Sequence, residues 1–147
     1  MNKEKNSPSV DSFKVKCKEH RLKTTPQRLA IYKELLRSDD HPHADIVFKK
    51  VRKIFPHISF DTINRTLLTF AELGIVAMVE GYGEPKRFDI KTDQHHHFRC
   101  IKCKDIVDFY HTSYDNIKVP ENLQRQYTIL AKRVVLEGIC DKCGKKS

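Results

Sequence analysis

The chain has 147 residues, with 28 lysines and arginines against 19 aspartates and glutamates, so its formal charge is +9. Hydrophobic residues make up 39% of the sequence, which excludes a disordered chain. No stretch approaches the ~20 apolar residues of a membrane helix, and the first ten residues lack a signal-peptide core. We therefore expect a soluble cytoplasmic protein of one or two small domains, with no membrane partner. Its basic charge favours nucleic acid as a partner, the alternative being a merely lysine-rich surface.

Four of the five cysteines form two CxxC pairs, Cys100/Cys103 and Cys140/Cys143. Two-residue spacing lets both thiolates of a pair turn towards one ion, and two pairs complete the tetrahedral Cys₄ set of structural Zn²⁺. A redox dithiol and an iron–sulfur site are the alternatives, and the sulfur count and reducing compartment favour zinc. Gly144 follows the second pair, as in a zinc knuckle, whereas Lys104 follows the first.

Four segments near the N-terminus have helical periodicity: 10–22, 27–37, 44–55 and 59–73. Thr25 with Pro26 is an N-cap signal, Ser59 is another, and Gly74 is a stop signal. In the first segment Cys17 is predicted to be a small half-buried hydrophobe. The inward face of the last segment is predicted to comprise Ile63, Leu67, Phe70 and Leu73.

The remaining segments predict short strands and one more helix. Residues 75–79 and 86–90 flank a turn at 81–85, which indicates a β-hairpin. Helices followed by a hairpin are the order of a winged helix-turn-helix, whose last helix enters the DNA major groove. Further along, strands are expected at 95–99, 106–110 and 132–138, with a crossing helix at 114–127. The fold class is therefore α+β, with domains at 1–91 and 92–147.

A second candidate metal site centres on the triplet His95-His96-His97. In a strand alternate side chains share a face, so His95 and His97 should point one way and His96 the other. A histidine triplet is also a common solvated surface run. Other candidate ligands lie elsewhere in the chain: His41, Asp89, Asp93 and Asp108. Three imidazoles and two carboxylates form a mixed set suited to Fe²⁺, Mn²⁺ or Zn²⁺.

These segments resemble the ferric uptake regulator family of metal-dependent repressors. The resemblance rests on Leu22-Lys23-Thr24-Thr25-Pro26-Gln27-Arg28, on His41-Pro42-His43-Ala44-Asp45, and on Ser59-Phe60-Asp61-Thr62-Ile63-Asn64-Arg65. It continues through Arg87-Phe88-Asp89, the histidine triplet, Ile106-Val107-Asp108-Phe109 and both CxxC pairs. In order and spacing the match runs from about residue 20 to residue 143, and it is most similar to the peroxide-responsive branch.

The resemblance implies a fold and a set of ligands. The fold would be an N-terminal winged helix-turn-helix DNA-binding domain and a C-terminal α/β dimerisation domain held by the Cys₄ zinc. A regulatory Fe²⁺ or Mn²⁺ would be bound by His41, Asp89, His95, His97 and Asp108. Asp108 is typical of peroxide sensors, since iron sensors more often have glutamate there. A further site of many relatives is incomplete, because Gln94 replaces a histidine and no histidine follows His111.

The function predicted from this resemblance is that of a homodimeric repressor of operator DNA, not an enzyme. Peroxide would react with the bound Fe²⁺ and oxidise a ligand, His41 or His95, and so end repression. One alternative is an iron- or zinc-responsive regulator without peroxide chemistry. A second is a metal-dependent hydrolase, for which the sequence offers no clearly placed general base.

The candidate DNA-binding residues lie on one loop and on the recognition helix: Lys23, Thr62, Asn64 and Arg65. Lys23 would reach the minor groove, Asn64 suits adenine, and Arg65 suits guanine or phosphate. Each is alternatively an ordinary solvated surface residue. The chain departs from the family pattern at Asn64, where a tyrosine is usual, and at Asp61 and Arg21.

Overall fold

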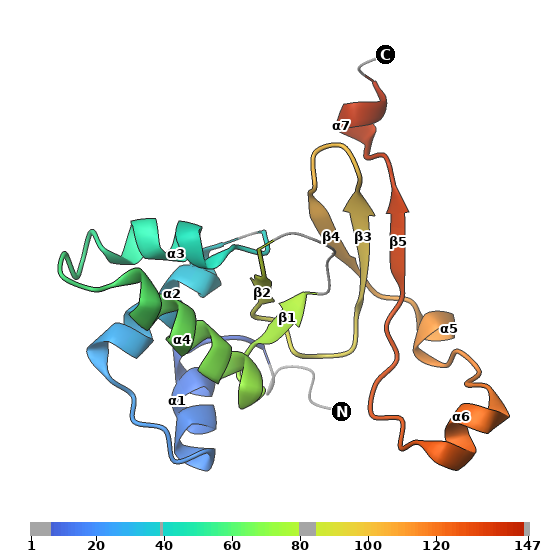
Figure 1. Cartoon of the computed structure of the whole chain (residues 1–147), viewed down its shortest axis with the longest axis horizontal. Helices are drawn as coiled ribbons and strands as arrows, with labels where there is room; N and C mark the ends of the chain where they lie inside the picture. Colours follow the sequence, from blue (N-terminus) through green and yellow to red (C-terminus); the bar gives the residue numbers. More distant parts are fainter. Residues whose placement is uncertain (1–6, 39, 80–84, 146–147) are drawn as a thin grey trace. The chain divides into compact units, whose positions relative to one another are not determined.

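The computed structural model describes residues 7–38, 40–79 and 85–145, which form two compact units, 1–93 and 94–147 (Figure 1). The expected domain boundary at 91/92 lies two residues before this division. Most of the expected hairpin turn, residues 81–84, lies outside the described residues. Among the described residues, no helix has the length and apolar character needed to cross a membrane.

The described part of unit 1 contains four helices: α1 (Val10–Glu19), α2 (Pro26–Arg37), α3 (Ala44–Val51) and α4 (Phe60–Glu72). The predicted caps of two of them are confirmed. The Thr25 hydroxyl accepts a hydrogen bond from the Arg28 N–H at 3.2 Å, and the Ser59 hydroxyl accepts one from the Thr62 N–H at 3.1 Å. Each cap pairs one of the backbone donors left free at a helix start.

Two of the predicted helices end earlier than expected. The first ends at Glu19, and Arg21 then adopts a left-handed backbone with φ 55°. The third ends at Val51, and the chain continues through turns to Phe55. Pro56 disfavours helical geometry in the residue before it, so the apolar periodicity that continues to Phe55 does not extend the helix.

The core of unit 1 is built around three aromatic rings in mutual contact. Phe13 of α1 stacks on Tyr32 of α2 with centroids 4.3 Å apart, and Phe70 of α4 meets Phe13 edge-on at 5.4 Å. All three are fully buried, as is Cys17. On α4 the predicted inward residues Ile63, Leu67 and Phe70 are buried, which confirms that face, and Leu73 is half-buried.

A two-stranded antiparallel sheet completes unit 1. Strand β1 (Ala77–Val79) pairs with β2 (Arg87–Asp89), with Met78 opposite Phe88. Residues 41–43 run beside β2: the Phe88 N–H donates to the Pro42 carbonyl at 3.1 Å, and His43 bridges to Arg87. The segment that contains His41 is therefore attached by its backbone to the strand that contains Asp89.

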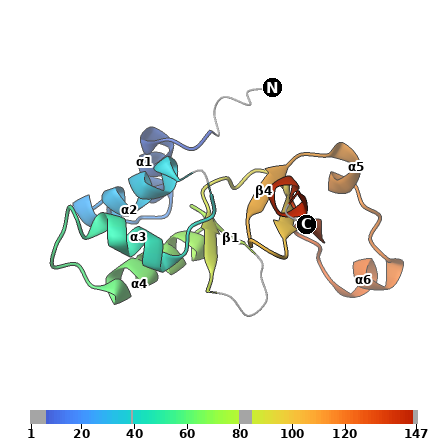
Figure 2. The same cartoon turned by 90° about the horizontal axis from the view of Figure 1, so that it is seen from above.

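Unit 2 is a three-stranded sheet in the order β4-β3-β5. The central strand β3 (His96–Cys100) is antiparallel to β4 (Ile106–Phe109) and parallel to β5 (Val135–Gly138). Because parallel strands need a long crossover, the chain leaves the sheet after β4 and returns at β5. In both views this crossover extends away from the sheet (Figures 1 and 2). A short helix, α7 (Asp141–Gly144), ends the unit.

The single crossing helix predicted at 114–127 is wrong. The crossover instead contains two short helices, α5 (Thr112–Asp115) and α6 (Glu121–Gln126). Pro120 separates them, because proline lacks a backbone N–H and keeps the preceding residue out of helical geometry. The residues of α6 are exposed, and the helix spans only six residues instead of extending along the crossover.

Candidate metal centres

The four paired cysteines converge at one end of the unit 2 sheet. Their sulfurs all lie within 4.8 Å of one another, and the Sγ atoms of Cys103 and Cys140 are 3.7 Å apart. Cys100 ends β3, Cys103 lies in the following turn, and Cys140 and Cys143 come from the start of α7. This arrangement has the ligand number and softness of a structural zinc site, as the spacing predicted.

The sequence led us to expect a tight zinc-knuckle turn at Gly144, after the second CxxC pair, but the backbone turns differently. The left-handed backbone lies at Lys104, with φ 68°, whereas Gly144 is part of α7 and has no positive φ. The Lys104 N–H donates to the Cys100 carbonyl at 3.0 Å, which closes the turn. The glycine after the second pair is therefore not needed for a left-handed turn, because a helix start supplies the curvature there.

The surroundings of the cysteine cluster shift the pKa values of its thiols in opposite directions. Backbone N–H groups of Cys103 and Cys140 point at the Cys100 sulfur and lower its pKa to about 6. The Cys143 thiol is shifted the other way. Its hydrogen bond with Cys140 is the largest cause and burial is the second, and together they raise its pKa to about 12. Four thiolates this close repel one another, and a divalent cation removes that repulsion. The donor set therefore fits Zn²⁺.

Two histidines and an aspartate form a second cluster in unit 2, termed here the β3–β4 cluster (His95, His97 and Asp108). The register places His97 directly opposite Asp108, with Nε2 and Oδ1 3.1 Å apart. The Nε2 atoms of His95 and His97 approach to 3.2 Å, and His95 lies 3.7 Å from the same carboxylate oxygen. Both imidazoles are buried. Three donor atoms converging in a buried position fit a divalent ion with mixed nitrogen and oxygen ligands.

Unit 1 contains a buried imidazole–carboxylate pair of the same kind. His41 Nε2 lies 3.3 Å from Asp89 Oδ2, and each side chain is 5% exposed. The Arg87 guanidinium donates to the His41 carbonyl at 2.5 Å, and the Lys91 N–H donates to Asp89 Oδ1 at 2.9 Å. The Lys91 bond orients the Asp89 carboxylate, as the outer contacts of metal ligands commonly do, and the Arg87 bond holds the backbone at His41. Asp93, the remaining candidate ligand, is exposed.

His96 points away from its neighbours, as strand alternation predicted, and is used structurally. Its Nε2 lies 2.7 Å from Asp115 Oδ1, and its Nδ1 accepts a hydrogen bond from the Val134 N–H at 3.0 Å. Since Nδ1 accepts, Nε2 carries the proton and donates to the carboxylate. This fully buried ring thus connects β3 to both ends of the crossover. The sequence did not indicate Asp115, because nothing local pairs it with a histidine 19 residues away.

The predicted DNA-binding residues have separate environments in unit 1. Lys23 is exposed in the loop before α2, and its carbonyl accepts from the Arg28 guanidinium at 2.9 Å. The Thr62 hydroxyl bonds the Ser59 cap at 2.9 Å. Arg65 is exposed and forms an ion pair with Asp61, one helical turn earlier, at 2.9 Å. Asn64 is half-buried beside a surface hollow.

A helical unit with a two-stranded sheet, followed by a small sheet domain with a Cys₄ cluster, is the fold of a metal-responsive regulator. The sequence model of the ferric uptake regulator family matches residues 19–137, and the chain belongs to this family. Regulators of this family are transcription factors rather than enzymes. The family match agrees with the resemblance drawn from the motifs.

Among characterised relatives, peroxide-responsive regulators are prominent. The chain is 34% identical to the peroxide-responsive repressor PerR of Staphylococcus epidermidis over 83% of this chain and 81% of that protein. It is 33% identical to the peroxide operon regulator of Bacillus subtilis, over 88% and 89%. Both relatives are matched over most of their length, so the similarity includes both units.

Solved structures give the same fold. The peroxide stress regulator of Campylobacter jejuni superposes with a TM-score of 0.65 at 30% identity, over 86% of this chain and 95% of that one. The Helicobacter pylori ferric uptake regulator, which has three functional metal-binding sites, superposes with a TM-score of 0.72 at 19% identity, over 92% and 94%. The second likeness supports the fold alone.

Proposed function

We propose that this chain is a homodimeric, metal-dependent repressor of operator DNA that senses peroxide. The observation that carries the proposal is the repeated pairing of buried imidazole and carboxylate groups, once in each unit. Neither the His41–Asp89 pair nor the three donors of the β3–β4 cluster alone offer the ligand number of a tight transition-metal site. One Fe²⁺ or Mn²⁺ bound by His41, Asp89, His95, His97 and Asp108 would therefore join the two units.

Metal-dependent DNA binding follows from such a site by population shift. An ion that binds only when the units adopt one arrangement favours that arrangement by its differential affinity. If that arrangement presents two copies of α4 to successive major grooves, metal raises operator affinity without touching DNA. Binding to operator DNA also requires the cytoplasmic location expected from the sequence.

The peroxide step is proposed from the relatives and from the ligand set. Bound Fe²⁺ supplies the reducing power that activates peroxide. In the net reaction one ring C–H of His41 or His95 gains an oxygen atom and one molecule of water leaves. Both rings are buried beside carboxylates, so an oxidant generated there meets an imidazole before solvent. An oxidised ring would be a poorer ligand, so the site would lose affinity for the metal and repression would end.

Dimerisation is proposed through unit 2. Its apolar side chains are unusually exposed, notably Leu130 at 91% and Tyr127 at 61%. The edge strand β5 also exposes Val135 and Leu136. A small domain with this much uncovered apolar surface, and an edge strand, is stabilised by a second copy.

The central experiment compares operator binding by the Mn²⁺ and Fe²⁺ forms before and after peroxide. We expect peroxide to abolish binding only in the Fe²⁺ form, with one added oxygen on the peptide that contains His41 or His95. His57→Ala, at an exposed position of unit 1, is the matched control and should keep the full response. A response to iron or zinc without any added oxygen would instead establish the alternative regulator without peroxide chemistry.

A further inference from the structure

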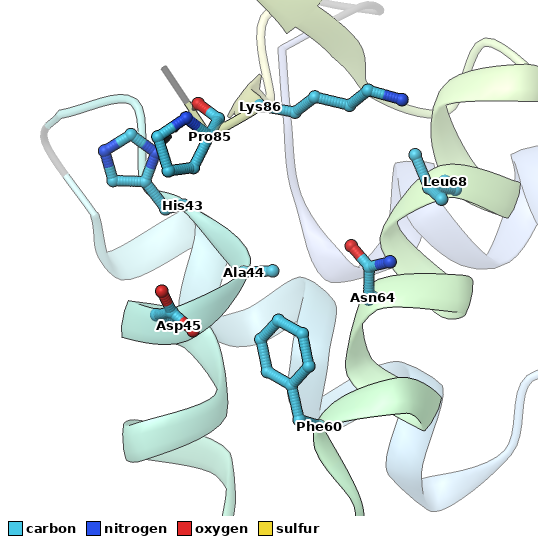
Figure 3. A pocket seen from close by; sticks show the side chains of 8 residues that line it. All are labelled: His43, Ala44, Asp45, Phe60, Asn64, Leu68, Pro85 and Lys86. Atoms are coloured by element: carbon cyan, nitrogen blue, oxygen red, sulfur yellow. Dashed lines mark hydrogen bonds between the residues drawn. The ribbon is translucent and has the colours of Figure 1, made fainter. Parts of the chain in front are cut away.

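A hollow of about 250 Å³ lies on unit 1 where three segments meet: the start of α3, the side of α4 and the two residues just before β2, Pro85 and Lys86 (Figure 3). Its walls are largely apolar, formed by Phe60, Leu68, Ala44 and Pro85. Ala44 is buried, whereas Phe60 is 42% exposed, so the hollow opens to solvent beside the predicted recognition helix. The hollow is therefore accessible from the face of α4 that we propose for DNA.

One amide side chain projects into this apolar hollow. Asn64 extends from α4 towards Ala44, with the Phe60 ring on one side and Leu68 on the other (Figure 3). An asparagine amide offers one acceptor and two donors in a plane. The other polar side chains that line the hollow are those of His43, Asp45 and Lys86, and His43 Nδ1 already pairs with the Pro85 carbonyl oxygen. Asn64 thus supplies the amide hydrogen-bonding groups of the hollow, and the charged or ionisable groups lie at its rim.

The opposite wall of the hollow has a fixed backbone. His43 Nδ1 lies 3.2 Å from the Pro85 carbonyl oxygen, and His43 forms a β-bridge with Arg87. On the α4 side, Phe60 packs edge-on against Phe48 of α3 with centroids 5.8 Å apart. These contacts hold the walls in place, so a ligand would meet a preformed shape.

The combination of amide and apolar wall matches one DNA base pair. In the major groove an A·T pair presents the adenine N7 acceptor and N6 donor, which asparagine can bind with two hydrogen bonds, and beside them the thymine methyl group. A G·C pair has no methyl group, and its edge matches arginine better than asparagine. The hollow is complementary to the first pattern.

The charges around the hollow favour a base edge over a phosphate inside it. Asp45 lines the rim, and its carboxylate would repel a phosphate. Lys86 lines the opposite side and is exposed, so its ammonium can reach the backbone that flanks the base pair. Arg65, next to Asn64, already has its charge partly neutralised by Asp61.

We propose that this hollow reads one A·T base pair in the operator. Asn64 is the specificity-determining residue, which binds the adenine edge, while Phe60 and Ala44 contact the thymine methyl group. The inference rests on the proposed DNA-binding function and adds to it a base preference at one position.

The test uses the full-length protein loaded with Mn²⁺. Duplexes are selected from a random pool, and binding is then measured for the preferred duplex with each thymine replaced in turn by deoxyuridine, which removes only the methyl group. We expect one position in each half of the operator to weaken binding about four-fold, from the area of a single methyl. Asn64→Ala should remove the A·T preference at that pair, a loss of about 5- to 150-fold in discrimination. Thr69→Ala, elsewhere on α4, is the matched control.

Three outcomes separate the hollow from the wider function. Loss of both the methyl effect and the base preference in Asn64→Ala supports the proposal. Metal-dependent binding with no deoxyuridine effect, and with an unchanged preference in Asn64→Ala, overturns the hollow and leaves the repressor function intact. Absence of duplex binding with Mn²⁺, Fe²⁺ or Zn²⁺ overturns both.

Discussion

His97 and Asp108 are direct partners across the β3–β4 ladder, with Nε2 and Oδ1 3.1 Å apart in a buried position. Because antiparallel pairing fixes which side chains stand opposite, the strands themselves create the core of the candidate metal site. The same strand faces its other histidine, His96, towards the crossover. One short strand therefore presents candidate metal ligands on one face and a histidine that holds the crossover on the other.

Removal of the carboxylate should weaken the regulatory ion selectively. Asp108→Ala takes an anionic oxygen ligand from His95 and His97, so we expect Mn²⁺ affinity to fall by at least about 10- to 100-fold. Zinc content should stay constant, since the cysteines lie elsewhere in unit 2. Isothermal titration with Mn²⁺ and zinc analysis measure both quantities. The exposed Glu121→Ala is the control, and equal Mn²⁺ affinity in both variants would contradict the assignment.

His96→Ala should have the opposite profile. It removes the hydrogen bonds to Asp115 and Val134 and leaves the Val134 N–H without its partner. We therefore expect the free energy of unfolding to fall by about 1–3 kcal/mol. The Mn²⁺ stoichiometry should be retained, because the ring points away from His95 and His97. Thermal unfolding with Mn²⁺ titration checks the prediction. If stability is unchanged and metal is lost, His96 is a ligand after all.

The cysteine cluster should behave as a structural site. Cys140→Ser removes one thiolate from the tetrahedral set, and the variant should lose zinc and unit 2 should unfold, because structural zinc supplies folding free energy directly. Cys17→Ser is the informative comparison. That residue is fully buried in unit 1, so the hydroxyl should lower stability by about 1–3 kcal/mol while zinc remains bound. Zinc analysis and unfolding curves are read together, and full zinc in Cys140→Ser would refute a four-cysteine site.

Asp61→Ala should strengthen binding to DNA. The carboxylate pairs with Arg65 at 2.9 Å and would itself face phosphates, so its removal frees one cation and removes one repulsion. We expect tighter binding to any duplex and a salt dependence steeper by about one ion. Binding is measured across a salt series, with the exposed Glu72→Ala on the same helix as control. Weaker binding by Asp61→Ala would mean that the ion pair positions Arg65 for a specific contact.

Local signals in the sequence determined much of this protein. The caps at Thr25 and Ser59 set two helix starts, because a hydroxyl beside free N–H groups acts within one turn. The period of two in the histidine triplet predicted which rings share a face, and CxxC spacing predicted the cysteine cluster. Each of these patterns depends on residues a few positions apart.

Tertiary structure decided what local patterns cannot express. The crossover breaks at Pro120 although its flanks look helical, and Asp115 binds His96 across 19 residues of chain. The hollow beside Asn64 is built from three segments that no periodicity connects. Caps, periods and spacings are properties of neighbouring residues, whereas hydrogen-bond partners and concave surfaces exist only once distant segments have packed together.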